Sequence, residues 1–306
     1  MASIYTISTS KLYLTLFPTF FFKKKKRKLT VYWLNRPQTL NAFGGDLMIE
    51  TISALDWLDK NSDTVITVLT GAGRFFSAGA DVRSVNETLT DSNLGVDKTR
   101  DQVDADGQQV QKTKEKITYL SHFAPHVELM RSIINHRKVF VVALNGPAIG
   151  GGAAWFPGIA DIVLASSNCY LQVPFSSLGL VPELGSAPIF SQIMGVHRAN
   201  EFLMFGRRFD APELEACGLF NRVFPELNFQ DHVSQYLSEI IATSDGQSLM
   251  EAKRLMNEPL RIGRLAAVME SVDALANRFV AGAPKDRFQM IKRKLEAKSK
   301  GRLSKL

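Results

Sequence analysis

Short apolar runs alternate along this chain with segments whose apolar positions recur at helical spacing. Residues 29–34, 65–69 and 139–144 are rich in β-branched side chains, which favour strands, and residues 162–165 and 170–173 resemble them. Strands that alternate with helices predict an α/β fold made of βαβ units with right-handed crossovers.

The segments between and after these runs predict helices. Residues 41–59 place Leu47, Met48, Ile52, Leu55 and Leu58 on one face, and Phe123, Val127, Met130 and Ile134 follow the same spacing. Residues 84–116 are polar, which predicts a mobile loop or a loosely packed helix. Beyond Ser186 the chain is mostly helical. There Asp210 and Glu213 form a box-like helix start, and Gly218 closes that helix.

Basic charge gathers near both ends of the chain, whose formal net charge is +7. The runs 23–28 and 285–305 favour anionic partners such as phosphates. The apolar segment 12–22 is much shorter than the roughly 20 residues that span a bilayer, so no membrane span is predicted. We interpret this segment as a β-strand followed by a basic turn or as a wrongly predicted first exon, with a chance nuclear-type patch as the alternative.

The last three residues, Ser304, Lys305 and Leu306, form a tripeptide that the peroxisomal import receptor reads at a free C-terminus. The tripeptide therefore predicts a location in the peroxisomal matrix. The alternative is a chance ending of a basic helix.

Two glycine-rich turns each follow a buried strand and open a helix, at residues 75–81 and 145–152. Two such turns can direct two backbone N–H groups at one oxygen, as an oxyanion hole requires, although glycine also serves close strand–helix packing. Neither turn matches GxxxxGK[ST] or GxGxxG, which disfavours nucleotide hydrolysis and dinucleotide binding. The two cysteines, Cys169 and Cys217, lack the partners of a zinc site or a disulfide framework.

Three motifs in order resemble the crotonase (enoyl-CoA hydratase/isomerase) superfamily over residues 29–295. They are Leu34-Asn35-Arg36-Pro37 with Leu40-Asn41-Ala42, then Phe76-Ser77-Ala78-Gly79-Ala80-Asp81, then Asn145-Gly146-Pro147-Ala148-Ile149-Gly150-Gly151-Gly152. The resemblance implies a repeated ββα spiral core over residues 29–225, after a poorly defined segment 1–28. It also implies a helical trimerisation region over residues 226–303 and assembly as a homo-trimer or hexamer.

The resemblance also implies a substrate site for a fatty enoyl-CoA thioester. The N–H groups of Ala80 and Gly151 would hold the thioester carbonyl. The residues expected to bind substrate are Ala78, Gly79, Ala80, Asp81, Val82, Arg83, Gly150 and Gly151. Arg83 stands where the family often has a basic residue near the CoA phosphates, although a solvated surface arginine is an equal alternative. No metal and no cofactor besides the CoA of the substrate are expected.

The acid–base residues indicate which reaction to expect, because the fold alone does not. Hydratases of this family carry two glutamates, and this chain has Ala154 and Phe175 at the matching places. Glu183 matches the single catalytic glutamate of peroxisomal Δ3,Δ2-enoyl-CoA isomerases, which residues 178–185 resemble. One carboxylate suffices to move a proton from C2 to C4 of a 3-enoyl-CoA in fatty-acid β-oxidation. A structural glutamate at a helix N-terminus is the alternative.

Other functions remain open. A dienoyl-CoA isomerase would also have an acid at the Glu183 position, but it normally has another where Phe175 stands. A binding protein that has lost catalysis is a further alternative, either for acyl-CoA or, through residues 23–28, for RNA; no aromatic platform accompanies that run, so nucleic acid is not the expected partner. The segment 150–161 has one extra residue and contains Trp155, Phe156 and Pro157, which leaves the shape of the acyl pocket open.

Overall fold

The structure, a computed structural model, describes residues 20–24, 28–44, 46–60, 63–81, 105–290 and 293. Val82, Arg83 and the terminal tripeptide lie outside the described residues. So do residues 84–104, 12–19 and parts of the basic runs 23–28 and 285–305. No helix in the described ranges is long and apolar enough to cross a membrane.

The core is a six-stranded sheet in the order β1-β2-β3-β4-β6-β9. Its strands are β1 (Phe20–Lys24), β2 (Leu29–Leu34), β3 (Ile66–Gly71), β4 (Val139–Leu144), β6 (Ile162–Ser166) and β9 (Arg222–Phe224). All neighbours pair in parallel except β1, which pairs with β2 in antiparallel fashion. The α/β class expected from the sequence is thus confirmed, and the sheet reaches Phe20 within the segment 1–28.

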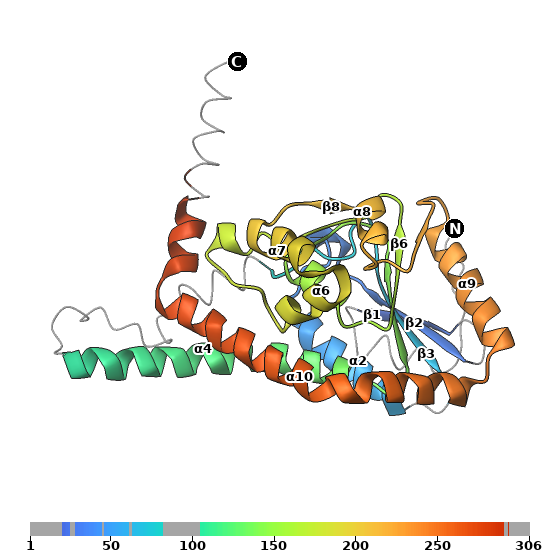
Figure 1. Ribbon diagram of the computed structural model, residues 1–306, viewed down its shortest axis with the longest axis horizontal. Coiled ribbons are helices and arrows are strands. Elements are labelled where there is room, and N and C mark those ends of the chain that lie inside the picture. The colour runs from blue at the N-terminus through green and yellow to red at the C-terminus, as the bar shows by residue number, and fades with distance from the viewer. Residues whose placement is uncertain are drawn as a thin grey trace, which may run out of the picture.

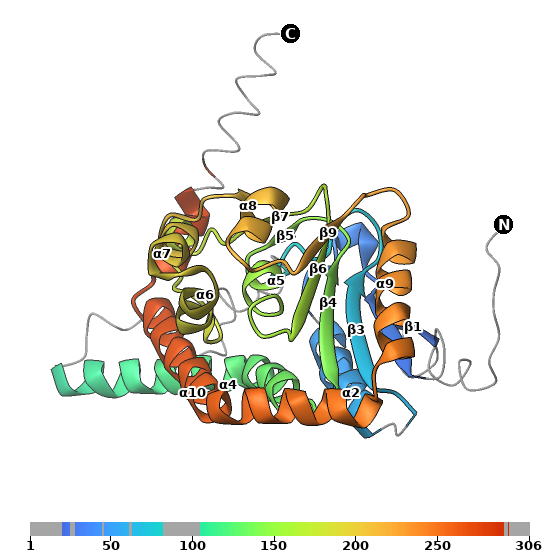
Figure 2. The same cartoon turned by 45° about the vertical axis from the view of Figure 1, so that its right-hand side comes forward.

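Helices cover both faces of this sheet, which is why its central strands read as continuous apolar runs. On β3 and β4, Val68 and Val141 pack with the helix α9 (Phe229–Thr243), whereas Leu69 and Val142 pack with the larger core on the other face. That face carries α2 (Asp46–Lys60), α4 (Ala105–Ile134), α6 (Ser186–Met194) and α7 (Val196–Phe205). Figure 2 shows α9 and α2 on either side of β3.

A smaller sheet joins β5 (Ala148–Ile149), β7 (Tyr170–Gln172) and β8 (Phe209–Asp210). The remaining short elements are η1 (Pro37–Thr39), α5 (Gly151–Ala154), η4 (Ser176–Leu178) and α8 (Ala211–Ala216). The predicted capping box is confirmed: the carboxylate of Asp210 accepts from the amide of Glu213, whose side chain accepts from the amide of Asp210.

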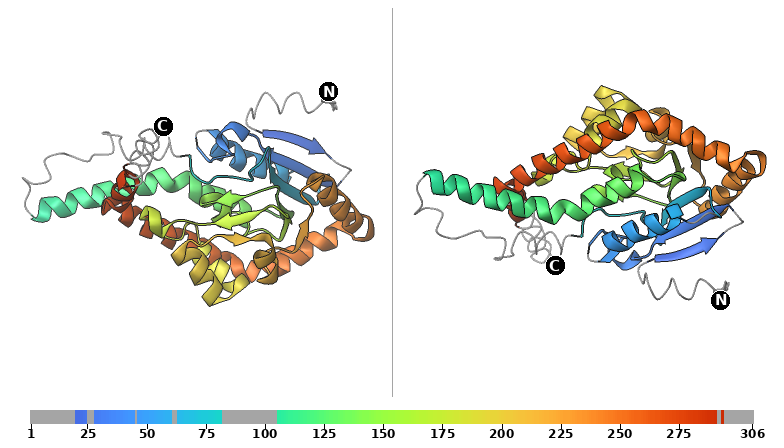
Figure 3. Two further views of the ribbon diagram at one scale, coloured as in Figure 1. Left: turned by 90° about the horizontal axis from the view of Figure 1, so that it is seen from above. Right: turned by 90° about the horizontal axis from the view of Figure 1, so that it is seen from below.

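The last helix, α10 (Gly246–Val280), runs beneath the core in Figure 1 and lies alongside α4 in both views of Figure 3. The ring of Phe279 on α10 lies 5.0 Å from that of Tyr119 and 5.5 Å from that of Phe123 on α4. Lys116 and Asp273 add an ion pair of 2.6 Å. The two long helices therefore form one packed pair that covers the end of the core where the candidate site lies.

Two helix boundaries differ from the sequence prediction. The helix expected from residue 41 begins at Asp46, because Leu40 and Asn41 have φ of 53° and 55°, a left-handed conformation that cannot continue a helix. The segment expected as a loop or loose helix up to residue 116 is regular helix from Ala105 onward. Packing of α4 against α10 supplies the stabilisation that its polar sequence does not indicate.

Candidate active site

The first glycine turn is fixed by the motif that precedes it in the chain. The Asn41 side-chain amide donates to the carbonyls of Ala72 and Phe75, both at 2.9 Å. The Ser77 hydroxyl donates to the Asn41 carbonyl and accepts from the amide of Gly79. Arg36 donates to the Ala42 carbonyl and pairs with Asp81 at 3.2 Å. These bonds hold the backbone of residues 77–81 in one shape.

The second glycine turn lies directly against the first. The amide of Ile149 donates to the Ser77 carbonyl at 2.9 Å, and the amide of Phe76 donates to the Pro147 carbonyl at 3.0 Å. A Cβ added to Gly79 would lie only 2.6 Å from the carbonyl oxygen of Ile149 and 3.1 Å from the amide nitrogen of Gly151. Glycine at position 79 is therefore needed for the two backbones to approach so closely.

Two backbone amides at this junction lack an acceptor. The parallel bridge between Phe43 and Ala80 uses the carbonyl of Gly79 and the amide of Asp81, so the amide of Ala80 stays outside it. Among the described residues neither this amide nor that of Gly151, at the start of α5, donates a hydrogen bond. Both residues line the cavity described below, so the two amides are available to an oxygen atom of a ligand bound there.

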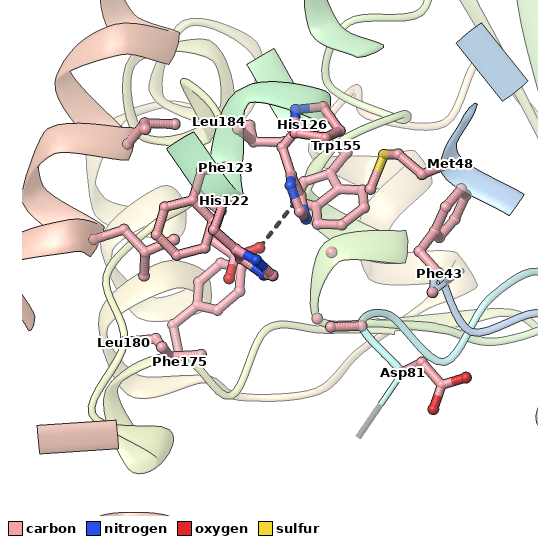
Figure 4. Close-up of a pocket in the computed structure, with 18 of the residues that line it drawn as sticks. Phe43, Met48, Asp81, His122, Phe123, His126, Trp155, Phe175, Leu180 and Leu184 are labelled. Carbon is pink, nitrogen blue, oxygen red and sulfur yellow. Dashed lines mark hydrogen bonds between the residues drawn. The ribbon is translucent and has the colours of Figure 1, made fainter. Parts of the chain in front are cut away.

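A cavity of about 540 Å³ lies beside the two turns. Its lining is mostly apolar and comes from α2, α4, α10, both turns and the segment 174–184. Figure 4 shows many of these side chains around the opening. Among its lining residues are Phe43, Ala78, Ala80, Asp81, His122, Phe123, His126, Gly150, Gly151, Trp155, Phe175, Leu180, Glu183, Leu184 and Phe279.

Glu183 stands in a loop that is folded back by two left-handed residues, Leu184 with φ of 50° and Gly185 with φ of 80°. One of its carboxylate oxygens accepts a hydrogen bond of 2.9 Å from the indole Nε1 of Trp155, drawn as the dashed line in Figure 4. Burial raises the pKa of the Glu183 carboxyl to about 7, against the opposing effect of the bond from Trp155. A carboxyl group with this pKa can accept and return a proton near neutral pH.

Among the described residues, Asp81 is the other acidic residue of the cavity lining. Its carboxylate is paired with the Arg36 guanidinium, and Figure 4 shows it apart from the group formed by His122, His126 and Trp155. Glu183 is thus the carboxyl group on the apolar side of the cavity.

The two positions that carry glutamates in hydratases of this family are occupied here by buried apolar side chains. Ala154 and Phe175 are 4% and 2% exposed, and Phe175 lines the cavity next to Leu180 in Figure 4. Neither side chain can activate a water molecule.

The sequence did not point to the two histidines of the cavity, His122 and His126. They stand four residues apart on α4 and therefore share a helix face, which is the signal that could have found them. Burial lowers the pKa of both imidazoles, that of His126 to about 4, so both are neutral at pH 7. Within the described residues the Nδ1 of His126 is buried without a hydrogen-bond partner.

Most of the other predicted site residues line the same cavity. Ala78, Ala80, Asp81, Gly150 and Gly151 line the cavity together with Glu183, and Gly79 is the point of contact between the two turns. Val82 and Arg83 lie outside the described residues. No group of three or more His, Cys, Asp or Glu side chains suited to a metal ion occurs in the described part of the chain. Burial raises the pKa of the Cys169 thiol, which disfavours the reactive thiolate.

Comparison with known proteins gives the same family as the three sequence motifs. A model of the enoyl-CoA hydratase/isomerase family matches residues 24–102 and 98–300. A Delta(3,5)-Delta(2,4)-dienoyl-CoA isomerase of Pyricularia oryzae is 34% identical over 272 residues, which cover 85% of this chain and 92% of that protein. Enoyl-CoA delta isomerase 3, peroxisomal, of Mus musculus is 33% identical over 67% of this chain, which spans 57% of the mouse protein.

Solved structures confirm the fold. A crystal structure of an enoyl-CoA hydratase/isomerase from Pseudoalteromonas atlantica superposes with a TM-score of 0.74, at 22% identity, over 90% of this chain and 97% of that one. The crotonase fold expected from the motifs is therefore confirmed, with its helical C-terminal region. This chain belongs to the enoyl-CoA hydratase/isomerase family.

Proposed function

We propose that this protein is a Δ3,Δ2-enoyl-CoA isomerase that moves the double bond of 3-enoyl-CoA to give trans-2-enoyl-CoA. The observation that carries the proposal is the position of Glu183, whose carboxyl group lines the same apolar cavity as the free amides of Ala80 and Gly151. The family membership and the isomerase relatives support the general reaction class.

In this proposal Glu183 removes a proton from C2, which the thioester makes acidic. The negative charge of the resulting dienolate moves to the thioester oxygen, where the amides of Ala80 and Gly151 stabilise it. The protonated Glu183 then returns the proton at C4. The pKa of about 7 favours both halves of this transfer, because neither protonation state is strongly preferred at neutral pH.

The CoA part of the substrate would lie along residues 78–82, with Arg83 near its phosphates, while Gly150 and Gly151 contact the substrate from the second turn. Gly79 and Gly150 allow the ligand to approach the backbone there. The acyl chain would enter the apolar part of the cavity between α4 and α10, which Phe123 and Phe279 line. Apart from the CoA carried by the substrate, the proposed reaction requires no cofactor or metal.

A second candidate, a dienoyl-CoA isomerase, is favoured by the name of the Pyricularia relative. The absence of an acid at position 175 weighs against it, since that reaction normally uses a second carboxyl group there. A hydratase is less well supported for the same reason, with Ala154 and Phe175 in place of its glutamates.

The test compares 3-enoyl-CoA, 3,5-dienoyl-CoA and 2-enoyl-CoA as substrates for the purified wild type and Glu183→Gln. We expect conversion of 3-enoyl-CoA, lowered about 10²–10⁴-fold in the variant, while an acyl-CoA analogue still binds. Faster turnover of the dienoyl substrate would favour the second candidate. An unchanged rate in Glu183→Gln would reject both isomerases with this base.

We also propose a peroxisomal location and a trimeric or hexameric assembly through α9 and α10. The name of the mouse relative and the tripeptide at residues 304–306 support the location. A fluorescent fusion with and without the tripeptide tests import, and light scattering on the purified protein tests the assembly.

A further inference from the structure

Trp155 contacts both halves of the candidate catalytic apparatus. Its indole Nε1 donates to the Glu183 carboxylate at 2.9 Å. Its ring also covers Gly151, since a Cβ added to Gly151 would lie only 2.3 to 2.8 Å from three of the indole carbon atoms. One side chain thus touches the carboxyl group and the residue that offers the second amide.

The indole has little freedom to move. Trp155 is 2% exposed, and its ring lies 5.4 Å from those of Phe43 and His126, the latter at an interplanar angle of 89°. Phe156 adds a further ring contact at 6.4 Å. A ring packed on several sides keeps its N–H in a fixed direction, so the oxygen that accepts from it is fixed as well.

The carboxyl group of Glu183 would otherwise be free to rotate. Burial is the main influence on its pKa, and among the described residues the hydrogen bond from the Trp155 indole opposes that influence. An N–H donor held by its neighbours fixes one carboxylate oxygen and leaves the other to face the cavity. Proton transfer to carbon depends on such alignment, where a misplacement of about 1 Å can cost about 10²-fold in rate.

We propose that Trp155 is the positioning residue of Glu183, holding one carboxylate oxygen so that the other points at the substrate carbons. The proposal rests on the proposed function, in which Glu183 is the base. Trp155 also gives a role to the segment 150–161, which carries it to the Glu183 carboxyl group.

Among the described residues that line the cavity, the ionisable groups besides Glu183 are His122, His126 and Asp81. His122 and His126 face the cavity from α4, and burial keeps both neutral at pH 7. Asp81 on the first turn is paired with Arg36. From α10, Arg278 donates to the carbonyl of Gly179. The indole N–H of Trp155 is therefore the group that stabilises the ionised form of the Glu183 carboxyl group by a direct hydrogen bond.

The first experiment observes the contact without an activity assay. The chain has three tryptophans, Trp33, Trp57 and Trp155, so the ¹⁵N-labelled protein gives three indole N–H signals that Trp→Phe variants assign. We expect the Trp155 signal to shift downfield as pH rises through about 7, since the N–H then donates to a charged carboxylate. The shift should vanish in Glu183→Gln. If no indole signal titrates between about pH 5 and 9, the proposal is wrong.

The second experiment uses Trp155→Phe, which keeps a ring and removes the N–H. We expect kcat to fall about 10- to 100-fold and the acid limb of kcat/KM to move to higher pH by about one unit, because the ionised carboxyl group loses a donor. Trp57→Phe on α2, which lies outside the cavity lining, is the matched control and should change neither. If the acid limb of kcat/KM stays at the same pH in a folded Trp155→Phe protein, the proposal is wrong.

The two experiments also separate this proposal from the proposed function. A titrating indole in a protein that isomerises no enoyl-CoA would reject the function and leave the Trp155–Glu183 pair in place. An active isomerase without a titrating indole would reject the role of Trp155 alone.

Discussion

Two glycines of the candidate site have no room for a side chain, and a third glycine elsewhere provides a comparison. Gly79 has φ of +88°, and an added Cβ would lie 2.6 Å from a backbone oxygen. At Gly151 the Cβ would meet the Trp155 ring at 2.3 Å. Gly263, exposed on α10, would place its Cβ more than 4 Å from any other group. Gly79 thus lets the two turns approach each other, and Gly151 leaves room for the Trp155 ring.

We expect Gly79→Ala to lower the free energy of unfolding by about 1–3 kcal/mol, because alanine is strained at this φ and its Cβ pushes the second turn away. Isomerase activity should fall as well, since the Ala80 and Gly151 amides would be displaced. Urea denaturation and the 3-enoyl-CoA assay measure the two effects.

Gly263→Ala is the control for that variant. Alanine is a better helix former than glycine by up to about 1 kcal/mol, so this variant should be slightly more stable and fully active. If Gly79→Ala and Gly263→Ala change stability and activity to the same extent, the close contact at Gly79 is not important for the site.

Among individual residues, the sequence identified those that belong to recognisable motifs. It missed those that reach the candidate site only through the packing of distant elements. Glu183, Ala80 and Gly151 were found because their neighbours in the chain carry a recognisable pattern, and all three line one cavity. His126 was missed because it reaches the cavity only when α4 packs across the turns. Trp155 was noted as part of a longer segment, but its bond to Glu183 joins residues 28 positions apart, which local pattern does not reveal.

Among the elements, the pair formed by α4 and α10 links stability to substrate binding. Phe279 on α10 packs on Tyr119 and Phe123 and also lines the cavity. Asp210, by contrast, caps the short helix α8 and does not line the cavity. These two positions allow a loss of stability to be separated from a loss of binding.

We expect Phe279→Ala to lower the free energy of unfolding by about 3 kcal/mol and to raise KM for long-chain substrates, because it leaves a void in the wall of the acyl pocket. Asp210→Ala should cost about 1 kcal/mol and leave KM unchanged. Denaturation and steady-state kinetics with two acyl chain lengths check both. A raised KM in Asp210→Ala would mean that general destabilisation, rather than the pocket wall, governs binding.

The strands β2, β3, β4, β6 and β7 were predictable because each is a short apolar run between breaking residues. The strands β5, β8 and β9 were not predicted, because two or three residues are too few to show a pattern. The start of α2 was predicted five residues too early, since the apolar spacing does not register the left-handed Leu40 and Asn41. The regular part of α4 before residue 117 depends on contact with α10, far along the chain, and its own polar sequence does not indicate it.

For the molecule as a whole, the buried base should lower stability as pH rises. The folded-state pKa of Glu183 is about 7, above the ordinary value of 4.5. Between these values the folded protein binds the proton that the unfolded chain has released, so stability falls as pH increases from about 4.5 to 7. His126 and His136, whose pKa values burial lowers from 6.5 to about 4 and about 3, act in the opposite direction over a pH range that overlaps this one.

We therefore expect Glu183→Gln to be more stable than the wild type at pH 8, by about 1–3 kcal/mol, and nearly equal to it below about pH 5. The two histidines are present in both proteins, so their effect cancels in the difference. Urea unfolding of both proteins at pH 8 and below about pH 5 measures the difference in their stability. A difference that stays constant with pH would contradict the raised pKa of Glu183.

The most direct test of the proton shuttle follows the proton itself. In a single turnover of 3-enoyl-CoA deuterated at C2, carried out in ordinary water, one carboxyl group in an apolar cavity should return part of the label to C4. Mass spectrometry and NMR of the trans-2-enoyl-CoA product measure that fraction. Deuterium at C4, lost together with product formation in Glu183→Gln, is the result that we predict. Product that carries no label at C4 and forms equally fast in the variant would contradict a transfer by Glu183.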